Sequence, residues 1–134
     1  MKIEEHMAKA ERFVQSLKKL DPQKDFEAVM WGRMHICSNW MNAALHAKGV
    51  ISENDDVAHT WYLFEYGDHD FLEANIDEET RRALTELAVF ESLRTTYVRG
   101  PATYGSEVCE LSERAYNHLK EFTENAIAAM SPGA

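Results

Sequence analysis

Apolar residues recur every three or four positions through most of the chain, the spacing that places them on one face of an α-helix. This pattern predicts helices over roughly residues 2–20, 22–48, 77–98 and 106–129. The alternation of apolar and polar residues that is typical of a half-buried strand does not appear in the sequence. We therefore expect an all-α protein, an antiparallel up-and-down helical bundle of four long helices plus a short aromatic-rich helix.

Residues at the predicted helix boundaries suit their positions. Pro22 can occupy the first turn of a helix, where a missing N–H has no effect, and Gly49 suits a left-handed C-terminal cap. Asp77 and Ser106 can each begin a helix, because their side-chain oxygens can accept a hydrogen bond from a backbone N–H of the first turn. Ser52, followed by Glu53, Asp55 and Asp56, similarly predicts an N-cap for the short helix, or pair of helices, that reaches about residue 71.

Size and charge narrow the class of protein. A length of 134 residues predicts one domain, 1–134, of which 131–134 are expected to form a frayed tail. The 23 acidic residues outnumber the 14 Lys and Arg, for a net charge of −9, which disfavours general binding to nucleic acid or to an anionic membrane surface. The chain contains no apolar run long enough to span a membrane, so no membrane association is expected.

The N-terminal residues and the two cysteines predict the location of the protein in the cell. The first residues are charged throughout and lack the apolar core of a secretory signal. Cys37 and Cys109 are the only cysteines, and both are expected to be reduced thiols inside helices. We therefore expect a cytoplasmic protein.

Six histidines raise the question of a metal site. His35 and Cys37 are two residues apart and so point about 200° apart around a helix, which prevents them from sharing an ion. No two histidines have the four-residue spacing of helical metal sites, and His35, His46 and His59 could converge only through tertiary contacts. The sequence therefore predicts no metal and no cofactor, and it contains neither a nucleophile elbow nor a phosphate-binding Gly-rich loop.

Arg94 lies on the apolar face of the helix predicted over 77–98. A guanidinium in such a position must either be paired or face a cleft, because an unpaired buried charge is very unfavourable. Pairing with Glu91, three residues earlier, would be purely structural. A cleft that binds an anion would instead include Tyr97 and Arg99. Arg33 occupies a similar position on the helix predicted over 22–48.

The three tryptophans, Trp31, Trp40 and Trp61, also lie at helical spacing and are expected in the core. Any tryptophan that proves to be exposed would favour a dimer interface over a ligand cage.

Three segments of the chain resemble a known family. They are the helix from Glu27-Ala28 through Asn42-Ala43-Ala44-Leu45-His46-Ala47-Lys48-Gly49, then Val57-Ala58-His59-Thr60-Trp61, and then Leu93-Arg94-Thr95-Thr96-Tyr97 followed after a gap by Ser106-Glu107. Over about residues 26–122 the chain is similar to the HEPN superfamily, the higher eukaryote and prokaryote nucleotide-binding helical domains.

This resemblance implies an up-and-down bundle that is often a homodimer. The family includes ribonuclease toxins and the partners of small nucleotidyltransferases. Its nucleases use an Arg followed a turn or two later by a His. Arg94 matches that Arg, but positions 98–101 read Val-Arg-Gly-Pro and provide no His. Other relatives show Arg-x-x-Asp-Tyr or a similar motif; Arg94 and Tyr97 match its Arg and Tyr with one residue fewer between them, and Thr96 replaces the acid.

Three functions follow as hypotheses. The first is a non-catalytic HEPN-like module that binds a nucleotide, an RNA or a protein partner. The second is an RNA-cleaving nuclease that combines Arg94 with a displaced His35 or His59, and Tyr97 is the further catalytic candidate. The third is a structural or oligomeric bundle with no small-molecule ligand. The candidate binding residues are Arg94, Tyr97, Arg99, Arg33, His35 and His59.

Overall fold

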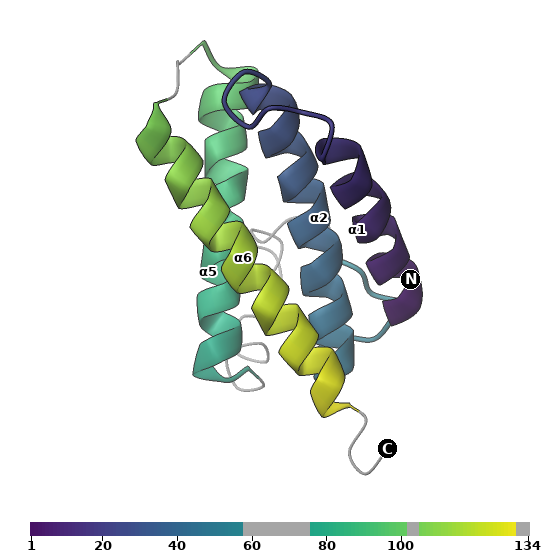
Figure 1. Cartoon of the computed structure of the whole chain (residues 1–134). Helices are drawn as coiled ribbons and strands as arrows, with labels where there is room; N and C mark the ends of the chain where they lie inside the picture. Colours follow the sequence, from purple (N-terminus) through teal and green to yellow (C-terminus); the bar gives the residue numbers. More distant parts are fainter. Residues whose placement is uncertain (58–75, 102–104, 131–134) are drawn as a thin grey trace.

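The computed structural model describes residues 1–57, 76–101 and 105–130. The helices are α1 (Ile3–Leu17), α2 (Phe26–Ala47), α5 (Glu78–Leu93) and α6 (Ser106–Ala129), and a π-helical segment, η1 (Arg94–Arg99), continues α5. These described ranges contain no strand. Successive helices run in opposite directions, and α2 lies between α1 on one side and α5 and α6 on the other (Figure 1). The predicted all-α antiparallel bundle is confirmed. The expected short aromatic-rich helix falls mainly outside the described residues.

The hydrophobic core is built around α2, which packs against α1, α5, η1 and α6. The largest side chains with almost no exposed surface come from three helices and include Phe26, Met30, Ile36, Leu45, Leu84, Phe90 and Leu119. Burying each of these side chains stabilises the fold by about 1.5–3 kcal/mol relative to leaving it exposed. Among the described helices, α1 packs on α2 alone.

The turn between α1 and α2 is longer than the sequence pattern predicts. The Asp21 carboxylate accepts hydrogen bonds from the backbone N–H groups of Gln23 (2.8 Å) and Lys24 (3.2 Å). The Asp25 carboxylate accepts one from the N–H of Asp21 (2.8 Å). These bonds stabilise a turn in place of the first helical turn, since short acidic side chains compete with the helix for backbone N–H groups. The predicted start of α2 at residue 22 is therefore wrong, and α2 begins at Phe26.

The predicted left-handed cap after α2 is confirmed. Gly49 has a φ of +72° and lies just after the C-cap residue, Lys48. The N–H of Gly49 donates to the carbonyl of His46 (3.1 Å), and the N–H of Val50 donates to that of Leu45 (2.9 Å). This pair of bonds satisfies carbonyls that the end of the helix leaves without partners.

The predicted N-terminal caps have different outcomes. Asp77 caps α5 as expected, because its carboxylate accepts a hydrogen bond from the N–H of Thr80 (2.8 Å). Ser106 is the first residue of α6 and not its cap, a position taken by Gly105. The predicted helix start near residue 52 is also wrong, since 52–57 form turns and bends.

The helix predicted over 77–98 ends close to the expected residue, but its last six residues are π-helical and not α-helical. α5 stops at Leu93, and Arg94–Arg99 continue as the π-helical segment η1. Single π-helical turns are rare and occur frequently at functional sites. The segment ends at Gly100, where a Cβ atom would lie only 2.6 Å from the carbonyl oxygen of Thr96. A side chain at this position would collide with backbone, which explains why glycine stands here.

The predictions for the tryptophans and for the membrane are tested only in part. Trp40 is buried as expected, whereas Trp31 is 45% exposed, so its predicted place in the core is wrong. Trp61 lies outside the described residues. None of the described helices combines the length and the apolar character needed to cross a membrane. The homodimer and the cytoplasmic location stay predictions.

Candidate functional site

Two histidines and an aspartate meet at the end of the bundle where α1 begins and α2 ends. His6 Nε2 and His46 Nε2 each lie 2.8 Å from the same carboxylate oxygen, Oδ1 of Asp56. The two imidazole ring centroids are 5.4 Å apart. Only 4% of the His6 side chain and 3% of the His46 side chain are exposed, compared with 35% for Asp56. The cluster therefore has a buried imidazole side and an open carboxylate side.

Three parts of the chain bring this cluster together. His6 lies on α1 one turn before the buried Ala10, and His46 is in the last turn of α2. Asp56 follows in the connecting segment, which Asn42 holds against α2. The Asn42 side chain accepts a hydrogen bond from the N–H of Val57 (2.7 Å) and donates one to the carbonyl of Val57 (2.8 Å).

The far side of each imidazole ring is held by an oxygen. His6 Nδ1 lies 2.8 Å from the side-chain oxygen of Asn39, and His46 Nδ1 lies 3.2 Å from the backbone carbonyl oxygen of Ile51. The Asn39 amide nitrogen donates to the carbonyl of His35 (2.9 Å), which fixes the orientation of that amide. Both rings are thus oriented with Nε2 toward Asp56.

The surroundings of Asp56 favour its charged form. Partial burial raises the pKa of this carboxyl group, but its close polar contacts with His6, with the amino group of Met1 and with His46 outweigh that effect and lower the pKa to about 2. The Met1 amino group lies 2.9 Å from Asp56 Oδ2 and also donates to the carbonyl of Glu53. Asp56 is therefore an anion throughout the neutral range.

The arginine and tyrosine predicted from sequence lie at the opposite end of the bundle, on η1. Arg94 and Tyr97 are half-buried and Arg99 is exposed. The Tyr97 ring meets the edge of Phe26 at the start of α2, with centroids 5.9 Å apart. The buried Nε of Arg94 has no hydrogen-bond partner within the described part of the chain. These three side chains share one short segment, as the sequence pattern predicted.

Two other candidate binding residues, Arg33 and His35, contact side chains outside η1. Arg33 donates a hydrogen bond to the Ser112 hydroxyl (3.2 Å) and lies over the ring of Tyr116 on α6, 5.2 Å from its centroid. His35 faces α1, where its ring stacks on Phe13 with centroids 5.6 Å apart. Both side chains thus have packing partners on α2 and its neighbours.

The remaining sequence predictions concern His59 and the two cysteines. His59 lies outside the described residues. Cys37 is buried and Cys109 is half-buried, and neither forms a disulfide. Burial raises the pKa of both thiols, so neither is poised as a thiolate nucleophile.

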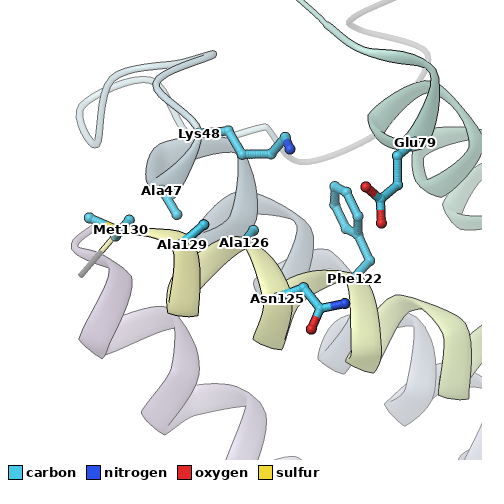
Figure 2. Close-up of a pocket in the computed structure, with 8 residues that line it drawn as sticks. All are labelled: Ala47, Lys48, Glu79, Phe122, Asn125, Ala126, Ala129 and Met130. Carbon is cyan, nitrogen blue, oxygen red and sulfur yellow. The ribbon is translucent and has the colours of Figure 1, made fainter. Parts of the chain in front are cut away.

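A cavity of about 250 Å³ opens between the C-terminal ends of α2 and α6 and the start of α5 (Figure 2). Its apolar wall is mainly Phe122, Ala126 and Ala129, and Lys48 and Glu79 are at its rim. The Lys48 ammonium group is already paired with Asp77 (3.1 Å) and lies over the Phe122 ring. The cavity therefore offers an apolar floor with few polar groups aimed into it.

Sequence reasoning missed the cluster of His6, His46 and Asp56. One signal was available, because His6, Ala10, Phe13 and Leu17 are spaced by four, three and four residues, which places His6 on the buried face of α1. The meeting of His6 with His46 and Asp56 depends on how α1 docks on α2, and no local pattern reports that.

Comparison of the chain with family models, with curated proteins and with solved structures found no match.

Proposed function

We propose that this chain is a non-catalytic HEPN-like helical module that binds the phosphate group of a nucleotide or an RNA through the π-helical segment η1. The observation that carries the proposal is the buried Nε of Arg94, which lacks a hydrogen-bond partner among the described residues. A buried N–H of a guanidinium without a partner is costly, and a bound phosphate oxygen is a well-matched acceptor for it.

Two neighbours of Arg94 support an anionic ligand. Arg99 is exposed in the same six-residue segment and adds a second positive charge. The Tyr97 ring is only half-buried, so part of its surface is available to a nucleobase. Because the whole chain carries a net charge of −9, this local pair of arginines suits one phosphate group better than a long nucleic-acid backbone.

The absence of a histidine from positions 98–101 favours binding over cleavage, because RNA cleavage requires a general base. His35, one of the two displaced bases considered above, is packed against α1 through Phe13 and Trp31. This arrangement does not place it beside η1. The nuclease hypothesis would therefore depend on His59.

The proposal is tested by thermal unfolding of the purified chain with mononucleotides and with short RNAs that carry either a phosphate or a hydroxyl at the end. A ligand at about 100 times its Kd stabilises a protein by about 2.7 kcal/mol, which raises Tm by several degrees. We expect such a shift in the wild type, and we expect Arg94→Ala to weaken affinity about tenfold or more, since a hydrogen bond to a charged group contributes about 1.5–3 kcal/mol.

Two matched variants control for charge and for stability. Arg114→Ala removes an exposed arginine from α6 and should leave binding unchanged. Arg33→Ala removes a structural arginine, so it should lower Tm without changing affinity. Equal ligand shifts in the wild type and in Arg94→Ala would contradict the proposal. A loss of stability in Arg94→Ala without any ligand effect would instead support a structural pairing of Arg94.

A further inference from the structure

The hydrogen bonds around the histidine cluster leave two imidazole lone pairs aimed at one anion. The partner of His6 Nδ1 is the side-chain oxygen of Asn39, whose orientation is fixed because its nitrogen donates to the carbonyl of His35. The partner of His46 Nδ1 is a backbone carbonyl oxygen. Oxygens of these kinds only accept, so each Nδ1 must carry the proton. In a neutral imidazole the remaining nitrogen, Nε2, then holds a lone pair.

Both lone pairs point at Oδ1 of Asp56, which is itself an acceptor. Each of the two imidazole acceptors lies 2.8 Å from this carboxylate oxygen, and acceptors so close repel each other unless something positive lies between them. Protons on both Nε2 atoms would satisfy them but would place two imidazolium ions, with centroids 5.4 Å apart, on side chains that are 4% and 3% exposed. One metal cation resolves the same arrangement with both rings neutral.

We propose that His6, His46 and Asp56 form a binding site for one divalent transition-metal ion, of which Zn²⁺ is the best suited. The three ligand atoms all lie within 4.8 Å of one another. Two imidazole nitrogens and a carboxylate oxygen are the donors that Zn²⁺ and its neighbours in the series prefer, whereas Mg²⁺ and Ca²⁺ select oxygen ligands throughout. This site lies at the opposite end of α2 from η1 and does not depend on the function proposed above.

The surroundings of the cluster match those of metal-binding histidines in general. A histidine ligand usually donates its second ring N–H to a carbonyl or carboxylate oxygen, which fixes the ring and strengthens the metal bond. Asn39 and Ile51 supply such oxygens. In a tetrahedral zinc site, two ligand atoms lie roughly 3.3 Å apart, so the carboxylate has to retreat by roughly 0.5 Å from its present position. Asp56 is the most exposed ligand and directly follows the turn and bend at 53–55, where such a shift is easily accommodated.

The proposed site has three protein ligands, and a water molecule on the partly exposed carboxylate side would complete a four-coordinate site. Its ligands come from α1, from the end of α2 and from the segment after it. A bound ion would therefore fasten α1 to the rest of the bundle.

The first test is calorimetric titration of the full chain with ZnCl₂ after removal of metals by a chelator. We expect one Zn²⁺ per chain and a Tm that rises with Zn²⁺ and falls again when the chelator is added. Titration with CoCl₂ should give the visible absorption of a nitrogen- and oxygen-coordinated ion, without the near-ultraviolet band of a thiolate ligand. A Cys109→Ser background excludes the half-buried thiol as a ligand.

Variants assign the ion to these three residues. Asn39→Ala removes only the supporting oxygen and should weaken zinc affinity by about 10- to 100-fold. Asp56→Asn and His46→Gln remove ligands and should weaken it at least as much. Asp56→Asn changes a residue near the surface, so this variant should still fold. The test therefore remains valid if His6→Gln fails to fold.

Two control variants resemble these changes elsewhere on the surface. Asp55→Asn removes the neighbouring exposed carboxylate, and His118→Gln removes the histidine that pairs with Glu86 at 2.5 Å. Both should bind Zn²⁺ as the wild type does. The proposal would be overturned if Asp56→Asn and His46→Gln both bind Zn²⁺ as tightly as the wild type does. A wild-type chain that shows no saturable binding of one ion per chain would also overturn it.

Discussion

At the scale of single residues, Asn42 on α2 is a buried polar side chain that forms three hydrogen bonds. It is 4% exposed, and its amide bonds to both backbone groups of Val57 as well as to the carbonyl of Ser38 (3.0 Å). These bonds fasten the segment that carries Asp56 to the end of α2. Hydrophobic periodicity does not identify such a residue, because a buried amide is defined by the partners it meets after folding.

We expect Asn42→Leu to lower the free energy of unfolding by about 2–4 kcal/mol, because it leaves the N–H and C=O of Val57 without their partner and each lost partner costs about 1–3 kcal/mol. Urea unfolding at neutral pH measures this change. Asn117→Leu, an exposed position on α6, is the matched control and should change stability by no more than about 0.5 kcal/mol. Equal midpoints for the two variants would mean that water replaces the Asn42 bonds at little cost.

At the scale of helices, the start of α5 combines a cap with an ion pair. Asp77 accepts hydrogen bonds from the N–H (2.8 Å) and the hydroxyl (2.7 Å) of Thr80, and its other oxygen lies 3.1 Å from the Lys48 ammonium. The bonds from Thr80, followed by that from Lys48, lower the pKa of Asp77 from its ordinary value of 3.8 to about 2. Asp77 thereby links the start of α5 to the end of α2.

This lowered pKa sets the sign of a pH effect. The ionised Asp77 stabilises the fold fully above the unfolded pKa of 3.8, and this stabilisation is lost as the pH falls through the folded pKa of about 2. Asn at this position still caps the helix but lacks the charge. We therefore expect the free energy of unfolding of the wild type to exceed that of Asp77→Asn by about 1 kcal/mol or less at pH 5, because the Asp77 side chain is 56% exposed. This gap should shrink at pH 3.

Urea unfolding of both proteins at the two pH values measures that gap. Comparing the variant with the wild type at each pH removes the contribution of Asp56, which titrates in the same window. Glu78→Gln is the control, since it removes an adjacent carboxylate that is 81% exposed. A gap between wild type and Asp77→Asn that is the same at pH 5 and pH 3 would show that the charge of Asp77 has no part in stability.

At the scale of the whole molecule, the sequence predicts the bundle because its signals are local. Three- and four-residue apolar spacing, the acid before α5 and the glycine after α2 each act within one or two turns. The late start of α2 was missed because the carboxylates of Asp21 and Asp25 compete with the helix for backbone N–H groups. The π-helical character of η1 was also missed, since its six residues carry no pattern that distinguishes them from an α-helix.

The two candidate sites also differ in whether their residues are close in sequence or meet only after folding. Arg94, Tyr97 and Arg99 could be grouped from sequence because they lie within two turns of one helix. His6, His46 and Asp56 are separated by up to 50 residues along the chain, and only the docking of α1 on α2 brings them together. Arg33 and His35 were both candidate binding residues, yet they contact side chains on α6 and α1 respectively.

The one-sided attachment of α1 has a consequence for how the native state opens. α1 packs on α2 alone among the described helices, and only two of its residues, His6 and Ala10, are fully buried. Local opening follows such differences in contact, so α1 can detach while α2, α5 and α6 stay packed. We expect the amide hydrogens of α1 to exchange with solvent deuterium at least about ten times faster than those in the middle of α2, a gap of about 1.4 kcal/mol. Equal protection of both helices, measured by hydrogen–deuterium exchange, would mean that the bundle opens as one unit.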